Sequence, residues 1–158
     1  MATVLKFVLL ATVIFYCPVI MAQQKPGPTK PIQKFKPPKL STTLGIRFDS
    51  ATVLREEAVQ LVTLPLKITD DKKKPYTITS YSLTYKRKAV TEDEQTGKVS
   101  PVTSNVSGFF EATPLPQLWK NILVEQLKPG EELFFYDIVV KDPQGRLMYA
   151  PTLSIKVK

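Results

Sequence analysis

The chain has 158 residues and a formal net charge of +8 at pH 7, and its 43% of hydrophobic residues suffices to build one folded domain. It contains no histidine, so Ser-His-Asp and Cys-His catalytic sets are excluded and the commonest metal ligand is missing. The single cysteine, Cys17, lies in a segment that we expect to be removed, which leaves no thiolate ligand in the mature chain. Paired carboxylates occur in turn-like segments, so a hydrolase is the least favoured class. We therefore expect no enzyme, no catalytic residue, no metal and no cofactor.

Residues 1–22 have the pattern of a secretory signal peptide. Lys6 is the only charged side chain, an apolar run follows over residues 7–19, and Ala22 is a small residue that suits the position before a cleavage site. A retained membrane anchor is the alternative, because the uncharged run reaches the lower length limit of a spanning helix, although Pro18 interrupts it. We expect cleavage, and hence an exported protein of the periplasm, the outer membrane or the cell exterior.

Residues 23–40 form a segment of different composition, rich in proline and lysine and free of acidic residues. Proline fixes φ and removes backbone donors, and like charges repel, so this tether is expected to be extended and polyproline-II-like. Its candidate binding residues are Lys25, Lys30, Lys34, Lys36 and Lys39. Two interpretations remain open: a solvated spacer, or an electrostatic arm that contacts lipid headgroups, acidic glycans or an acidic partner. Nucleic acid is excluded as a partner, since Phe35 is the tether's only aromatic residue.

Residues 41–158 are expected to form one domain, and its first half is typical of strands. Residues 60–69 are rich in apolar residues, and their alternation over 64–68 predicts a strand, in which Pro65 indicates an edge position or a bulge. Residues 70–75 are a charged turn. Residues 76–88 predict a long strand, and a change of parity near Thr79 and Ser80 indicates a bulge. The polar residues 89–100 are expected to form a hairpin loop before a short returning strand.

One helix is predicted over about residues 114–127. Thr113 suits the N-cap, proline is tolerated in the first turn, and apolar residues including Trp119 recur at helical spacing. The Trp119 stripe is interpreted as the face that docks on the sheet, with a ligand platform as the alternative. The Lys128-Pro129-Gly130 sequence ends the helix.

The last part of the chain returns to strands. Residues 132–141 are apolar on both alternating faces, which predicts a central strand with Phe134, Tyr136, Ile138 and Val140 on one side. Residues 142–145 predict a turn, because aspartate, proline and glycine each favour one of its positions. Residues 153–157 alternate apolar and polar side chains. Several strands and one short helix indicate a mainly β protein, an immunoglobulin-like β-sandwich.

The order of these features resembles the C-terminal domain of the gliding-motility and type IX secretion protein GldM. The resemblance covers about residues 61–158, and its matching stretches are residues 76–83, 127–130, 134–140, 142–145 and 153–157. Gln144 departs from it, since the family has a Pro-Asp-Gly turn at this place. The resemblance implies a β-sandwich-like domain in the bacterial cell envelope and partners among envelope proteins, including type IX secretion components.

The sequence thus predicts a non-catalytic, exported protein-interaction module of the cell envelope, associated with type IX secretion or gliding machinery. The alternative is a glycan-binding or anionic-surface-binding protein that uses the basic tether. The oligomeric state does not follow from the sequence.

Overall fold

The computed structural model describes residues 35–158. The predicted signal peptide and most of the tether, with Lys25, Lys30 and Lys34, lie outside the described residues. The chain divides into two compact units, residues 1–35 and 36–158, and the second contains the described helices and strands. Among the described residues, no helix combines the length and the apolar character needed to cross a membrane.

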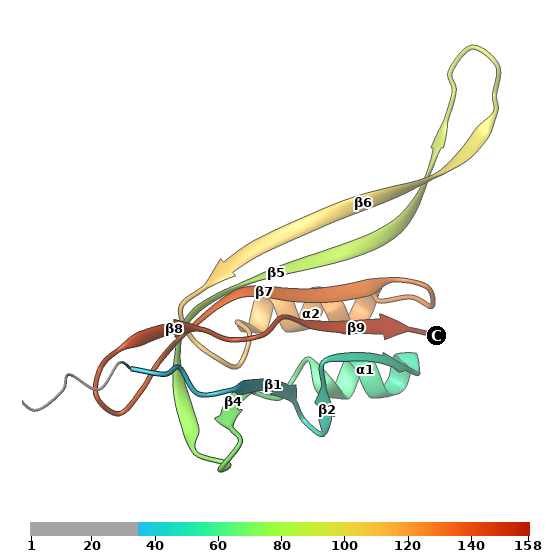
Figure 1. Ribbon diagram of the computed structural model, residues 1–158. Coiled ribbons are helices and arrows are strands. Elements are labelled where there is room, and N and C mark those ends of the chain that lie inside the picture. The colour runs from blue at the N-terminus through green and yellow to red at the C-terminus, as the bar shows by residue number, and fades with distance from the viewer. Residues whose placement is uncertain (1–34) are drawn as a thin grey trace, which may run out of the picture. The chain divides into compact units, whose positions relative to one another are not determined.

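The described unit is mainly β, which confirms the predicted class (Figure 1). Its strands are β1 (Leu40–Leu44), β2 (Arg47–Phe48), β3 (Ser50–Val53), β4 (Leu66–Asp70), β5 (Pro75–Glu92), β6 (Val99–Phe110), β7 (Glu132–Lys141), β8 (Leu147–Tyr149) and β9 (Leu153–Val157). Its helices are α1 (Arg55–Leu61) and α2 (Gln117–Gln126).

All nine strands of the described unit belong to one hydrogen-bonded sheet, so an immunoglobulin-like pair of stacked sheets is not confirmed. The strand order is β2-β1-β4-β5-β7-β9-β3, with β6 added to β5 and β8 added to β7. Only Asp49, with a φ of 55°, separates β2 from β3. The two ends of the strand order are therefore neighbours in the chain, and the sheet curves until it is nearly closed into a barrel. The Asp49 carbonyl accepts a hydrogen bond from the Ser154 amide at 3.1 Å and ties this seam.

The core fills the inside of the curved sheet. It contains inward-facing residues of most strands together with one side of each helix, among them Leu44, Ile68, Leu83, Phe135 and Leu123. Tyr81 and Tyr85 also lie fully inside. Burial raises the pKa of Tyr81 to about 12, against a weaker opposite effect of its hydrogen bond with Thr113.

Two helices are present in the described unit, where the sequence analysis expected one. The unexpected helix α1 has only seven residues, too few for a periodic pattern to stand out. Glu56 and Glu57 lie in its first turn, where negative charge is favourable, and Ala58 and Leu61 are buried against the core.

Helix α2 begins at Gln117 rather than near residue 114. Thr113 is not its N-cap, because the Thr113 hydroxyl accepts a hydrogen bond from the Leu66 amide at 2.7 Å and so joins the loop to β4. The C-terminal end of α2 is capped by a side chain from a distant part of the sequence. Arg55 Nε donates to the Leu127 carbonyl at 2.7 Å, and its Nη2 donates to the Val124 carbonyl at 3.0 Å.

The bulge predicted in β5 is confirmed, since its register with β7 shifts on both sides of Ser80. A second bulge in β7 was missed. Asp137 adopts a φ of 47°, and Leu133, Phe135, Ile138 and Val140 are all buried. The predicted grouping of Phe134 and Tyr136 with Ile138 and Val140 is therefore wrong, because the extra residue moves the apolar side chains after it to the other parity.

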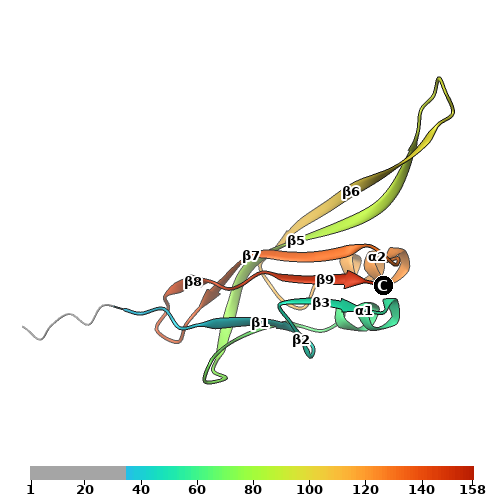
Figure 2. The same ribbon diagram turned by 45° about the vertical axis from the view of Figure 1, so that its right-hand side comes forward.

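The hairpin of β5 and β6 is longer than predicted. Its strands pair from Tyr81 with Phe110 to Glu92 with Val99, which leaves only residues 93–98 as a loop. Residues 89–100 are polar because they are exposed to solvent, although half of them belong to strands. Pairing of β5 with β7 ends at Lys86, so beyond this residue the hairpin is a two-stranded ribbon that projects from the body, here called the arm (Figures 1 and 2).

Near the start of β5 the predicted strand over residues 64–68 is shifted to Leu66–Asp70. Leu64 is 42% exposed and lies before the strand, as does Pro65. Strand β4 pairs with both β1 and β5, so Pro65 does not mark an edge strand. Proline has no amide hydrogen to donate to a neighbouring strand, and β4 begins directly after it.

Candidate functional site

The two faces of the sheet around β5 and β7 differ. The inner face is covered by α2, which lies behind β7 in the view of Figure 1. Trp119 of α2 meets Phe110 edge-on, with ring centroids 5.3 Å apart. Gly108 makes room for this indole, since a Cβ there would lie 2.6 Å from Trp119 Cζ2. The Trp119 stripe therefore docks the helix, as predicted.

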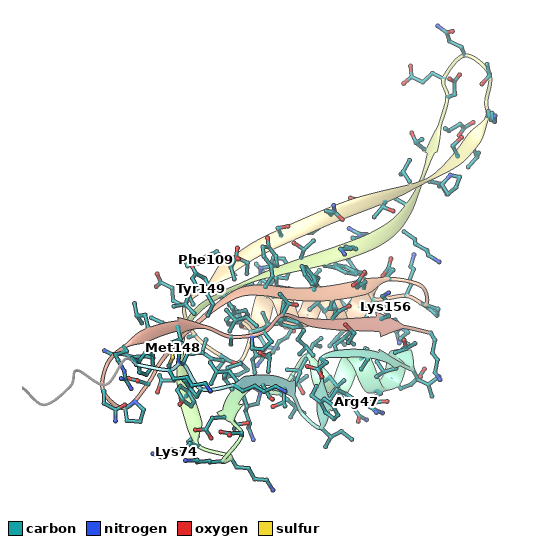
Figure 3. All side chains as sticks on the ribbon, viewed as in Figure 1. Arg47, Lys74, Phe109, Met148, Tyr149 and Lys156 are labelled. Carbon is teal, nitrogen blue, oxygen red and sulfur yellow. The ribbon has the colours of Figure 1, made fainter. Side chains whose placement is uncertain are left out.

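The outer face of the same strands carries aromatic side chains. Strand pairing places Phe109 and Tyr136 on either side of Ser82, and Tyr149 opposite Val139. We define the aromatic face as Phe109, Phe134, Tyr136 and Tyr149, which come from β6, β7 and β8. Figure 3 shows Phe109 and Tyr149 pointing away from the body.

The rings of the aromatic face are held in place to different degrees. Phe134 and Tyr136 stack with centroids 5.4 Å apart and an interplanar angle of 13°. Lys86 Nζ lies 4.9 Å from the Phe134 ring centroid, which gives a cation–π contact. Phe109 and Tyr149 are by contrast 64% and 77% exposed. Phe109 and Tyr149 thus leave most of their aromatic surface in contact with solvent.

Polar groups at the edge of the aromatic face are paired. Lys86 Nζ lies 3.2 Å from Glu132 Oε2, and the Ser154 hydroxyl donates to Glu132 Oε1 at 2.5 Å. Partial burial acts to raise the pKa of Glu132, but the hydrogen bonds from Ser154 and Lys86 outweigh it and hold that pKa below its ordinary value. Glu132 is therefore a charged hydrogen-bond acceptor at neutral pH. The face offers rings, hydroxyls and one fixed ion pair, which is chemistry for binding.

The structure describes two of the tether lysines, Lys36 and Lys39, and they lie outside the aromatic face. They line a hollow of about 640 Å³ together with the β4–β5 turn and the β7–β8 turn. We define the basic hollow by the residues that line it: Lys36, Pro37, Pro38, Lys39, Asp70, Asp71, Lys72, Lys74, Tyr76, Pro143, Gln144 and Arg146. The sequence analysis singled out the first two lysines but not the turn residues that join them.

Both turns of the basic hollow are built on an aspartate, as their sequences predicted. Asp70 Oδ1 accepts hydrogen bonds from the amides of Lys72 and Lys74 at 2.9 and 2.8 Å. Asp142 Oδ2 pairs with Arg146 Nε at 2.6 Å. Burial opposes ionisation of Asp142, yet the Arg146 amide and guanidinium keep its pKa below the ordinary value. These acids are thus occupied within the turns.

The lysines of the basic hollow are not neutralised in this way. Among the described residues, the ion pairs are Arg47 with Glu57, Lys86 with Glu132 and Arg146 with Asp142. Lys36, Lys39, Lys72 and Lys74 take part in none of them. The hollow is also lined by Asp70 and Asp71, but its lysines and Arg146 outnumber these two acids. The resulting net positive potential favours an anionic ligand or partner.

A third polar cluster lies at the base of the arm, and it is structural. Glu131 is only 2% exposed and accepts hydrogen bonds from the Lys128 amide at 2.8 Å, the Lys88 amide at 3.2 Å and the Tyr85 hydroxyl. Strand β7 begins one residue later, so the Glu131 carboxylate takes the place of a strand carbonyl for Lys88. Burial, with this hydrogen bond as a second cause, raises the pKa of Tyr85.

Sequence reasoning missed the aromatic face. Phe109 follows a run of serine, asparagine and glycine without alternation, and Tyr149 follows a turn, so neither had a pattern around it. The available signal was the pair Phe134 and Tyr136, whose aromatic rings could have been assigned to an outer face once Asp137 was recognised as a bulge.

Comparison with known proteins gives no relative from which function can be transferred. No family model matches the chain, and no curated protein matches it.

Proposed function

We propose that this chain is a non-catalytic, exported protein-interaction module of the bacterial cell envelope, and that it binds its partner through the aromatic face. The observation that carries the proposal is the exposure of Phe109 and Tyr149 beside the stacked pair Phe134 and Tyr136. Aromatic residues of this kind dominate the binding energy of protein interfaces when they are buried by a partner.

The cellular setting of the proposal comes from the sequence. Residues 1–22 resemble a signal peptide, and residues 61–158 resemble the C-terminal domain of GldM. The resemblance supports a partner among envelope proteins, including components of type IX secretion or gliding machinery. The periplasm, or the outer membrane facing it, is the corresponding location.

The test compares two phenylalanines of equal exposure. Phe109 and Phe48 are each 64% exposed, but Phe48 lies on β2, away from the aromatic face. Crosslinking of the tagged chain in its native cells, followed by mass spectrometry, should recover a protein partner. The Phe109→Ala variant should recover much less of that partner, Phe109→Ala/Tyr149→Ala should lose it, and Phe48→Ala should keep it. Equal recovery by Phe109→Ala and Phe48→Ala would remove the aromatic face as the binding site.

A second candidate function is the binding of a glycan or an anionic surface through the basic tether. Lys36 and Lys39 favour it, because these two tether lysines form no ion pair with any residue that the structure describes. Removal of residues 23–40 should then abolish a salt-sensitive binding to anionic vesicles or acidic polysaccharide, while the Phe109→Ala/Tyr149→Ala variant should bind as the unchanged chain does. Binding that survives the deletion would contradict this function.

A further inference from the structure

The arm lacks a partner within the described unit. Beyond Lys86 its two strands have no third neighbour, and an isolated two-stranded ribbon is marginally stable in water. Its side chains are largely exposed on both faces, including Val90 at 71% and Val99 at 57%. A ribbon with exposed valines gains stability when another molecule covers its end.

The end of the arm is acidic. Glu92, Asp93 and Glu94 lie together at the β5–β6 loop, where Lys98 is the only cation. Asp93 holds the loop, since its Oδ1 accepts hydrogen bonds from the Thr96 and Gln95 amides, and these bonds lower its pKa. Glu92 and Glu94 form no ion pair among the described residues. We define the arm tip as Val90 to Val99.

The basic hollow has the complementary character. Its cations outnumber its acids, Asp70 and Asp71, so its net charge is opposite to that of the arm tip. Its apolar lining is made of prolines and the Tyr76 ring, which suits the valines of the arm tip. The match therefore covers both charge and apolar surface.

The arm tip and the basic hollow lie at opposite ends of the unit. In Figure 1 the β5–β6 loop is at the far upper right, whereas the β4–β5 turn is at the lower left, where Figure 3 labels Lys74. The tip cannot reach the hollow of its own chain. We propose that the arm tip of one copy docks into the basic hollow of a second copy.

The proposed contact joins two different surfaces of identical chains, so the same contact can form again at each end of a dimer. Each added copy presents a free arm tip at one end and a free basic hollow at the other, so the contact produces open, head-to-tail chains unless its rotation closes a ring. The aromatic face takes no part in the contact and stays available along such an assembly. The assembly therefore goes beyond the proposed partner binding and does not depend on it.

The experiment uses two charge-reversed variants of the chain after removal of the signal peptide. Glu92→Lys/Glu94→Lys alters the arm tip and leaves Asp93 to hold the loop. Lys72→Glu/Lys74→Glu alters the basic hollow but keeps the backbone amides that Asp70 binds. Circular dichroism of each variant checks that the fold is retained.

Sedimentation velocity at low salt should show that the unchanged chain forms species larger than a dimer and that added salt dissociates them. Each variant alone should remain monomeric, with association weakened roughly tenfold or more. An equimolar mixture should associate again, because the unaltered arm tip of one variant meets the unaltered basic hollow of the other, and the two reversed surfaces are also opposite in charge.

A monomeric unchanged chain at high concentration, or a mixture that forms no dimer, would overturn the proposal. Loss of binding to phosphatidylglycerol vesicles in Lys72→Glu/Lys74→Glu, with no self-association of the unchanged chain, would assign the basic hollow to an anionic surface instead. The Phe109→Ala/Tyr149→Ala variant should assemble as the unchanged chain does, which separates failure of this proposal from failure of the proposed function.

Discussion

Replacement of Glu131 by alanine is expected to destabilise the fold at the base of the arm. The carboxylate is 2% exposed and serves three donors: the amides of Lys88 and Lys128 and the Tyr85 hydroxyl. The hydroxyl also donates to the Gln126 carbonyl at 3.1 Å, so the substitution leaves it one acceptor. The amides of Lys88 and Lys128 lose the carboxylate as their acceptor.

The size of the effect depends on these two amides. Each donor left without a partner costs about 1–3 kcal/mol when water cannot reach it. The hydrogen bonds of the Lys88 and Lys128 amides are only partly buried, which permits some hydration, so the lower half of that range applies. We expect Glu131→Ala to lower the free energy of unfolding by about 3 kcal/mol. Tyr85→Phe should lower it less, by about 1–2 kcal/mol, because it removes the hydroxyl that Glu131 and Gln126 share but leaves both amides with their acceptor.

Urea unfolding followed by circular dichroism measures these changes as a shift of the midpoint at constant slope. Glu125→Ala is the matched control, since Glu125 is exposed on α2 and should change the free energy by less than about 0.5 kcal/mol. Hydrogen exchange should also accelerate at the Lys88 amide in Glu131→Ala. A Glu131→Ala variant as stable as the control would refute the reasoning that this carboxylate replaces a strand carbonyl.

Three further predictions concern the same unit. Gly108→Ala should lower the free energy of unfolding by about 1–3 kcal/mol and change the fluorescence of Trp119, because the new methyl group meets the indole; unchanged fluorescence and stability would contradict this packing. Stability should fall between pH 10 and about 12, since the folded pKa of Tyr81 is raised: its contribution is complete below the unfolded pKa and lost as pH rises through the folded one. Tyr81→Phe should flatten that part of the pH profile. Glu132 acts in the opposite sense, because its pKa in the folded protein is lowered. Its contribution to stability is present above its ordinary pKa of 4.5 and is lost as pH falls through the lower folded pKa. Ser154→Ala should reduce this loss of stability in acid, measured by thermal unfolding.

Local features of the chain could be predicted because their causes are local. The turns at Asp70 and Asp142 follow from side chains that bond amides two and four residues ahead. The bulge near Ser80 follows from a change of parity within one strand. Strand alternation also placed most of the mainly β body correctly.

Other features depend on contacts between distant segments, and the sequence did not show them. Thr113 stands where a helix N-cap is expected, but its hydroxyl accepts a hydrogen bond from the Leu66 amide of β4 instead. The closure of the sheet depends on the pairing of β3 with β9, which no short window contains. The candidate site was missed for the same reason, because the aromatic face gathers residues from three strands, and Tyr149 joins it through its pairing with Val139, beyond the bulge at Asp137.

The parallel pairing of β3 with β9 also has a kinetic consequence. Ser50–Val53 comes early in the described chain and Leu153–Val157 late, so the seam cannot form before nearly the whole sequence is present. Contacts of such long sequence separation slow folding, because loop-closure entropy is lost before the contact stabilises anything. During synthesis the edge of β3 therefore stays without its partner strand until residues 153–157 have been made.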